Sequence, residues 1–298
     1  MTTYCVPGSI SEALEILGRY DGDALIIAGG TDVLPDIRKG KRSPRCLVDI
    51  THIPGLDQIT VAREYVEVGA AVTFSALTRH PYLQSHVQAL VDAAAAVGSA
   101  DIQNAATWAG NLVQALPAAD GAVVALALEA QVLVHDKDGM RGLPVARLFA
   151  GPGRSFVDPT RQIITAVRFR IPERPWGTGW RRIGRRDSLV LPILNCATVL
   201  ELAGGYIARA AIALGPVAPT PFRATAAEEF LVGQAPGDET FAEAARLVQR
   251  ESNPRSSRAS ASREYRLAAL PALVLDALTL ASRRAQEKPE LQRRERTG

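Results

Sequence analysis

The chain has few of the residues from which metal and redox centres are usually built. Only three cysteines and four histidines occur among its 298 residues. The cysteines, Cys5, Cys46 and Cys196, are far apart in sequence, so they form no CxxC pair of the kind that binds zinc or an iron–sulfur cluster. The histidines show no HxH or HxxxH spacing. We therefore expect no metal site, and the scattered cysteines suit a reducing compartment.

Long apolar runs and a strong net charge are also missing. The longest apolar stretch, residues 122–134, contains Glu129 and Gln131 and is too short to span a bilayer. The N-terminus lacks a basic region followed by an apolar run, so we expect no signal peptide. The formal charge is +3, without a broad basic stripe and interleaved aromatic residues. These absences predict a cytoplasmic protein that neither inserts into membranes nor binds nucleic acid.

What the chain does have is enough length and apolar content for two domains. It contains 47% hydrophobic residues, which is typical of a globular protein with a large core. Residues 173–179 are rich in proline and glycine, as expected of a linker. We therefore predict one domain over residues 1–175 and a second over 176–285. The charged residues 286–298 are predicted to form a disordered tail.

Local signals predict several elements within these domains. Ser9 and Glu12 have the spacing of a capping box, which places a helix start at residue 10. Residues 24–28 form a short apolar strand pattern, and residues 58–61 and 65–69 alternate like an antiparallel pair. Gly204 and Gly205, between two apolar segments, predict a tight hairpin.

The most informative features are two short glycine-bearing segments about eighty residues apart. Neither matches GxGxxG or GxxxxGKS/T, so a Rossmann unit or a P-loop is not expected. The first segment follows the strand pattern directly, and the second follows an alanine-rich helix pattern. The first consists of Ala28, Gly29, Gly30, Thr31 and Asp32, and the second of Thr107, Trp108, Ala109, Gly110 and Asn111.

Such segments can hold a long phosphorylated ligand at two places. Glycine lets backbone amides approach a pyrophosphate, and successive amides form an anion-binding concavity. Thr31, Thr107 and Asn111 add side-chain hydrogen-bonding groups, and Asp120 can accept a bond from a ribose hydroxyl. Each segment alone is better explained by a tight connection between a strand and a helix. The two together, in this order, favour a ligand site.

The order of several motifs resembles the FAD-binding medium subunit of the molybdenum hydroxylases, the xanthine dehydrogenase and aerobic carbon monoxide dehydrogenase family. The resemblance covers nearly the whole chain. Its departures are Trp108 and Ala109, where an aliphatic residue and glycine are frequent, and Gln103 in place of arginine. The motifs that carry it lie at residues 4–13, 28–32, 103–111, 117–120, 163–167, 182–186, 212–221 and 263–266.

The resemblance implies an α+β fold. The first domain is expected to have two α+β subdomains of the vanillyl-alcohol oxidase (PCMH) type with FAD between them, and the second a small antiparallel sheet with helices. By position, residues 28–32 are expected to wrap the pyrophosphate. The remaining residues implied to hold non-covalent FAD are Val97, Thr107, Ala109, Gly110, Asn111, Asp120, Ile164 and Arg181.

The resemblance also implies partners. Molybdopterin and 2Fe–2S clusters are expected on a large and a small partner subunit, in a heterotrimer or a dimer of heterotrimers. Electrons would pass from the clusters to this FAD and on to an acceptor such as NAD. Two alternatives remain: a self-contained flavin oxidoreductase of the same fold, and a scaffold subunit that has lost its flavin. No paired carboxylates or catalytic triad support the first of these.

Three other features have competing interpretations. The arginines at residues 181, 182, 185 and 186 are either a solvated face or a source of positive charge near a flavin, with Arg181 the best candidate for the second role. Trp108 is more typical of a core residue than of a cofactor contact. Asp32 is expected to cap the turn that follows it rather than to act as a base.

Overall fold

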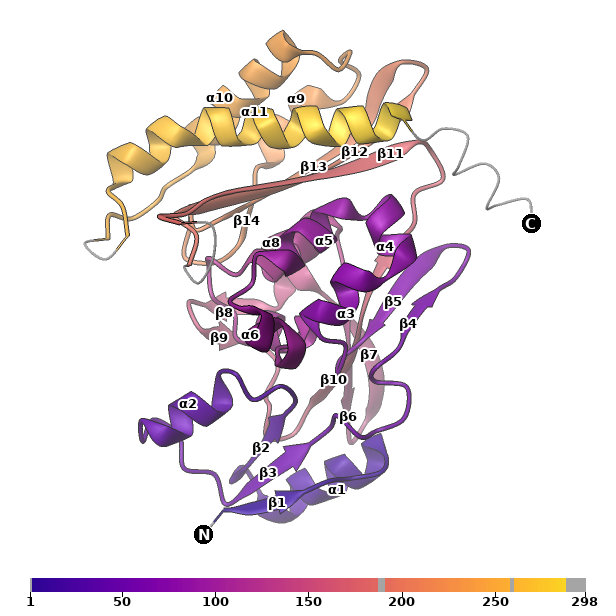
Figure 1. Ribbon diagram of the computed structural model, residues 1–298, viewed down its shortest axis with the longest axis vertical. Coiled ribbons are helices and arrows are strands. Elements are labelled where there is room, and N and C mark those ends of the chain that lie inside the picture. The colour runs from indigo at the N-terminus through magenta and orange to yellow at the C-terminus, as the bar shows by residue number, and fades with distance from the viewer. Residues whose placement is uncertain (1, 187–190, 258–259, 288–298) are drawn as a thin grey trace.

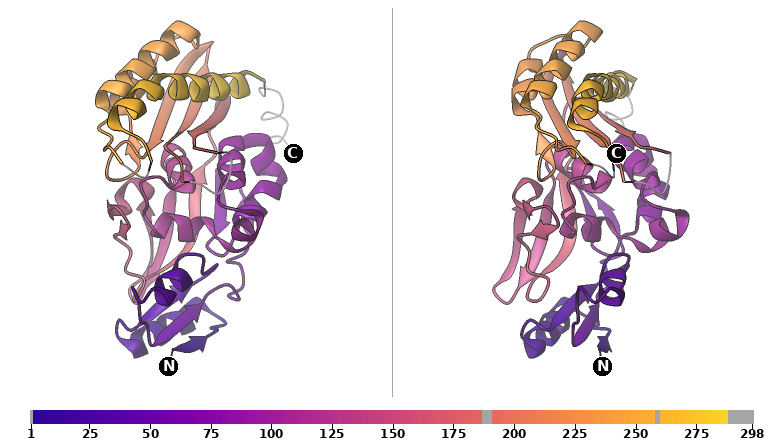
Figure 2. Two further views of the ribbon diagram at one scale, coloured as in Figure 1. Left: turned by 60° about the vertical axis from the view of Figure 1, so that its left-hand side comes forward. Right: turned by 90° about the vertical axis from the view of Figure 1, so that its left-hand side faces the viewer.

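The fold consists of two α+β units followed by a third unit built on an antiparallel sheet. A computed structural model describes residues 2–186, 191–257 and 260–287. The units lie one after another along the long axis of the molecule, with the N-terminal unit at one end (Figures 1 and 2). This arrangement confirms the α+β class and the antiparallel sheet predicted for the C-terminal part.

The N-terminal unit is a small parallel sheet with strand order β1-β3-β2. The predicted capping box is present: the Ser9 hydroxyl accepts a hydrogen bond from the amide of Glu12 at 3.1 Å, and the Glu12 carboxylate accepts one from the amide of Gly8 at 2.8 Å. The elements are β1 (Thr3–Cys5), α1 (Ile10–Tyr20), β2 (Ala24–Ile27), α2 (Val33–Arg38) and β3 (Cys46–Asp49).

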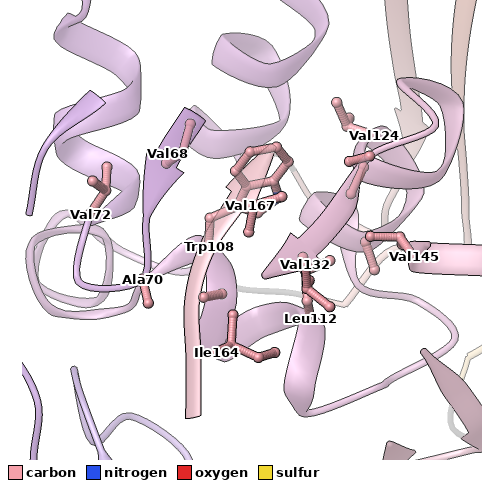
Figure 3. Packing of buried hydrophobic residues seen from close by; sticks show 14 of the residues in the cluster. Val68, Ala70, Val72, Trp108, Leu112, Val124, Val132, Val145, Ile164 and Val167 are labelled. Atoms are coloured by element: carbon pink, nitrogen blue, oxygen red, sulfur yellow. The ribbon is translucent and has the colours of Figure 1, made fainter. Parts of the chain in front are cut away.

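The second unit has a five-stranded antiparallel sheet with strand order β4-β5-β10-β6-β7. Valines of the sheet and residues of the helices pack around Trp108, which is fully buried (Figure 3). The strands are β4 (Ile59–Val61), β5 (Tyr65–Gly69), β6 (Gln131–Asp136), β7 (Gly139–Pro144), β8 (Phe149–Gly151), β9 (Arg154–Ser155) and β10 (Ile163–Arg170). The helices are α3 (Phe74–Arg79), α4 (Pro81–His86), α5 (Gln88–Ala95), α6 (Ala100–Ala105), α7 (Trp108–Val113), α8 (Asp120–Ala127) and the 3-10 turn η1 (Val145–Arg147).

The C-terminal unit is a four-stranded sheet whose two faces belong to different cores. Strands β12 and β13 form the predicted hairpin, and Gly204 and Gly205 both have positive φ, 60° and 86°, as a tight hairpin turn requires. The elements are β11 (Trp176–Ile183), β12 (Leu194–Ala203), β13 (Tyr206–Gly215), β14 (Phe222–Arg223), α9 (Thr225–Leu231), α10 (Asp238–Glu251) and α11 (Arg263–Glu287).

Strand alternation decides which side chains of this sheet reach the second unit. Leu194, Cys196 and Leu200 of β12 pack into the core shared with α10 and α11, whereas Ala197 and Val199 join the core of the second unit. The sheet therefore lies between α11 on one side and helices α5 and α8 on the other (Figure 1). Side chains of the C-terminal unit can in this way reach the helices that carry the candidate site.

Helix α11 is long and apolar enough, by length and composition, to cross a membrane. Half of its apolar window is buried, and it packs against β11 and β12 as the core helix of a globular unit. The helix continues through Gln286 and Glu287, so the predicted disordered tail does not begin at residue 286. Residues 288–298 of that predicted tail lie outside the described residues.

Candidate functional site

The first glycine segment connects strand β2 to helix α2. Gly30 has φ of +68°, in the left-handed region that favours glycine. In the part of the chain that the structure describes, the backbone amides of residues 28–32 donate no hydrogen bond. Consecutive amides that are free in this way form a concavity suited to the oxygens of a phosphate group. The Thr31 hydroxyl, half-buried at the same turn, is a further potential donor.

Asp32 does not have the role predicted for it. It occupies the N-cap position of α2, but its backbone is helical there (φ −109°, ψ −45°) and its carboxylate accepts no capping hydrogen bond. An N-cap side chain reaches the helix amides from an extended backbone, which Asp32 lacks. The carboxylate therefore leaves the amides of this turn free.

The second glycine segment is helical rather than a loop, because Thr107 caps α7. The Thr107 hydroxyl accepts a hydrogen bond from the amide of Gly110 at 3.1 Å. Trp108 is a core residue, as predicted: its indole N–H donates to the carbonyl of Gly121 at 2.9 Å, and its ring packs edge-on against Phe169. Ala109 is buried beside it.

The first segment touches the chain directly before the second segment. A side chain on Gly29 would lie within 3.0 Å of the Ala105 carbonyl, closer than any real contact allows, and at 3.0 Å from the Cα of Ala106. The backbone at Ala106 is fixed by a further hydrogen bond, because the Ala106 carbonyl accepts from the amide of Phe74 at 3.0 Å. The free amides of the first segment and the start of α7 therefore lie at one place, although about eighty residues separate them in sequence.

Asn111 of α7 and Asp120 of α8 add buried acceptors. The side-chain oxygen of Asn111 is buried, and no described residue donates to it. A Cβ atom added to Gly121, the residue after Asp120, would lie only 2.7 Å from this oxygen. A buried acceptor without a donor is costly, so its position favours a ligand that carries hydroxyl groups.

The Asp120 carboxylate is 6% exposed and lies at the start of α8. Burial raises its pKa to about 6, although a hydrogen bond from Asn195 and the charge of Arg182 act in the opposite direction. The Asn195 amide donates to Oδ1 at 2.5 Å, and Arg182 Nη1 lies 3.6 Å from Oδ2. Two residues of the C-terminal sheet therefore hold this acid.

The apolar candidates occupy two different positions. Val97 is half-buried just after α5, next to Ala96, whose carbonyl accepts a hydrogen bond from Arg182 at 3.0 Å. Ile164 is buried in β10, in the core around Trp108 and Leu112 (Figure 3). Val97 thus lies near the group around Asp120, whereas Ile164 supports the sheet beneath α7.

Arg182 lies near Asp120, whereas its neighbour Arg181 does not. Gly177 and Gly179 of β11 face α11, and Arg181 continues their alternation. Its guanidinium donates a hydrogen bond to the carbonyl of Trp180, whereas Arg182 lies against α5 and Asp120. Two adjacent arginines in a strand must point to opposite faces, so the choice between them depends on which face meets the second unit.

Sequence reasoning therefore ranked Arg181 above Arg182 and did not name Asn195, although Arg182 and Asn195 are the two that contact Asp120. A partial signal was present, because Trp176, Thr178 and Trp180 alternate with glycines along β11 and place Arg182 on the same face as the large residues. For Asn195 we find no local signal, since its partner Asp120 is 75 residues away. In residues 2–186, 191–257 and 260–287, no group of three or more His, Cys, Asp or Glu side chains could hold a metal ion.

Two family descriptions match the chain. Residues 1–173 match the FAD binding domain in molybdopterin dehydrogenase. Residues 181–281 match the C-terminal domain of the CO dehydrogenase flavoprotein. Together the two matches include both glycine segments, Asp120, Arg182 and Asn195.

Relatives and solved structures agree with these descriptions. The chain is 29% identical to the xanthine dehydrogenase FAD-binding subunit of Escherichia coli O157:H7, over 89% of this chain and 90% of that protein. It is 30% identical to the nicotinate dehydrogenase FAD-subunit of Eubacterium barkeri, over 77% and 79%. A chain of carbon monoxide dehydrogenase from Hydrogenophaga pseudoflava superimposes with a TM-score of 0.88 at 28% identity, covering 95% of this chain and 98% of that one.

Proposed function

The chain belongs to the FAD-binding subunits of the molybdenum hydroxylase family, and from this we propose that it is the electron-transfer subunit of such an enzyme complex. Its cofactor is FAD, which supplies the capacity to accept and release electrons. We propose that electrons arrive from 2Fe–2S clusters of a partner subunit and leave to an external acceptor such as NAD. Substrate oxidation would take place on a large molybdopterin-binding subunit.

The observation that supports FAD binding best is the contact between the first glycine segment and the chain directly before the second. Five free amides at residues 28–32 suit the pyrophosphate, which is an anion with several acceptor oxygens. The unpartnered oxygen of Asn111 and the acid of Asp120 suit hydroxyl groups, which FAD carries on its ribitol and ribose. The donor and acceptor groups of this chain therefore fit a ligand that has a diphosphate flanked by polyols.

We assign the following roles to the chain's own residues. Residues 28–32 hold the pyrophosphate, and Thr107, Ala109 and Gly110 position the start of α7 against it. Asn111 and Asp120 accept hydrogen bonds from the polyol portion, and Val97 contributes an apolar contact. Ile164 packs in the same core as Trp108 and thereby stabilises the position of α7.

Partner subunits are required because the chain cannot carry the rest of the electron path. Three cysteines are too few to ligate even one 2Fe–2S cluster with four thiolates. We propose a large molybdopterin-binding and a small 2Fe–2S partner, in a heterotrimer or a dimer of heterotrimers, located in the cytoplasm. We further propose that residues 1–175 hold the cofactor and that residues 176–285 close over it.

A visible spectrum of the purified chain tests the proposal. We expect a flavin spectrum, or uptake of added FAD, and reduction of that flavin by substrate only when the partner subunits are present. A colourless chain that takes up no FAD would contradict the proposal. Reduction by a small organic substrate without partners would favour a self-contained flavin oxidoreductase instead.

The variant Gly30→Val tests the first segment directly. Valine disfavours the left-handed φ of +68° at this position, so the free amides would turn away from the pyrophosphate. We expect weaker FAD binding in a titration of intrinsic fluorescence. Gly40→Val is the matched control, because Gly40 has φ of +69° but no neighbouring atom within 4 Å and lies outside the site.

A further inference from the structure

Asp120 is attached to the C-terminal sheet more firmly than to its own unit. The Asn195 amide bonds its Oδ1 at 2.5 Å and also donates to the Ala118 carbonyl at 3.3 Å. Asn195 is fully buried and packs against the backbone of Gly215, since a Cβ atom added to Gly215 would lie 2.6 Å from the Asn195 side-chain oxygen. The acid is therefore held in one orientation by a residue that is 75 positions away.

Arg182 links Asp120 to the other candidate contact. Its Nη1 lies 3.6 Å from Asp120 Oδ2 and donates to the carbonyl of Ala96, next to Val97. The side chains of Arg182 and Asp120 are only 10% and 7% exposed, so solvent screens their attraction little. One guanidinium thus joins the end of α5 to the start of α8.

The second carboxylate oxygen of Asp120, Oδ2, is available to accept a hydrogen bond from a ligand. No described residue donates a hydrogen bond to Oδ2, and Arg182 Nη1 lies 3.6 Å from it, at ion-pair distance. An ionised carboxylate accepts stronger hydrogen bonds than a protonated one. Oδ2 can therefore accept from a ligand hydroxyl while Oδ1 stays bonded to Asn195.

We propose that Arg182 and Asn195 are positioning residues, which hold the Asp120 carboxylate ionised and oriented so that FAD affinity depends on the C-terminal sheet. This inference rests on the proposed function, because it assumes that Asp120 accepts a bond from FAD. A purely structural role for these two residues would affect only the stability of the fold. Removing either residue should change the protonation of Asp120 as well as the stability of the fold.

The direction of that change follows from the surroundings of Asp120. Burial raises the pKa of Asp120, and the charge of Arg182 and the bond from Asn195 partly oppose this. Among the described residues, α5, α7, β13 and β14 bring no other charge that acts on it; Asp92 of α5 is paired with Arg284 instead. Loss of Arg182 or Asn195 should therefore raise the pKa further and protonate the acid at a higher pH.

The test is the dissociation constant of FAD measured from pH 5 to pH 8 on the full chain. We expect affinity to fall as pH drops through the pKa of Asp120. Arg182→Met and Asn195→Leu should weaken binding by roughly tenfold at pH 7. They should also move the midpoint upward by about one pH unit. Arg182→Lys should restore the wild-type profile, because it keeps the charge, and Asp120→Asn should remove the pH dependence.

Two further variants separate positioning from stability. Arg182→Gln keeps an amide donor for the Ala96 carbonyl but not the charge, so it should still fold and still show the shifted midpoint. Arg284→Met removes another arginine that bridges the units, through Thr178 and Asp92, without contacting Asp120. It should lower the melting temperature and leave the midpoint unchanged.

The outcomes are distinct. Unchanged midpoints in Arg182→Gln and Asn195→Leu, with wild-type protein still binding FAD, would overturn the inference and leave the proposed function standing. A wild-type chain that binds no FAD would overturn both. Equal midpoint shifts in Arg182→Gln and Arg284→Met would show that any weakening of the contact between the units has the same effect, which also contradicts the inference.

Discussion

Replacing Gly29 with alanine should separate the two halves of the proposed FAD site. The new methyl group would lie within 3.0 Å of the Ala105 carbonyl carbon and oxygen, and these are backbone atoms that cannot rotate away. An ordinary contact of about 3.5 Å requires the two segments to move apart by roughly 1.5 Å. The φ of Gly29 is not in the left-handed region, so this effect is purely steric.

The expected loss of affinity follows from that displacement. Hydrogen bonds from amides to a phosphate oxygen need distances of about 2.7–3.2 Å, so a movement of this size breaks them. Each bond to a charged group contributes about 1.5–3 kcal/mol. Loss of two such bonds weakens FAD binding by about 3–6 kcal/mol, or roughly a hundredfold to more than ten-thousandfold.

Isothermal titration of the apoprotein with FAD measures this change. Gly18→Ala is the control, because Gly18 lies within α1 and a side chain there meets no atom within 4 Å. We expect that variant to bind FAD normally and to gain up to about 1 kcal/mol of stability. A Gly29→Ala protein with wild-type affinity and an unchanged melting temperature would refute the contact between the segments.

Three more changes test other parts of the structure. The folded apoprotein favours protonated Asp120, so this residue stabilises the fold below its ordinary pKa of 3.8, and the stabilisation is lost as pH rises through about 6. The variant Asp120→Asn stays neutral at every pH. Its free energy of unfolding, measured by thermal unfolding, should therefore exceed that of wild type by up to about 3 kcal/mol at pH 7.5 but not at pH 4. A gain that is equal at both values would contradict the shifted pKa. Trp108→Ala should cost about 3–5 kcal/mol in urea unfolding, since it empties the core of the second unit; a loss below 1 kcal/mol would show that this core is loosely packed. Gly177→Ala places a methyl group against the Ala281 carbonyl of α11 and should cost about 1–3 kcal/mol while FAD affinity stays normal; a lost affinity would mean that α11 contributes to the site.

The local parts of the fold were predictable because their determinants are neighbours in sequence. The capping box of Ser9 and Glu12 and the paired glycines at 204 and 205 act through hydrogen bonds and backbone angles within a few residues. The first glycine segment was recognisable for the same reason. The second segment was less so, because Thr107 satisfies the amide of Gly110 and makes a helix of what resembles a loop.

The sequence by itself determined the family, the two glycine segments and the acid at position 120. Only the tertiary structure decided that Gly29 lies against Ala105, and that Arg182 rather than Arg181 faces Asp120. The reason is physical. Contacts between residues as far apart in sequence as Arg182 and Asp120 depend on strand register and on which face of a sheet meets which helix. A shift of one residue along β11 would exchange the two arginines without altering any local pattern.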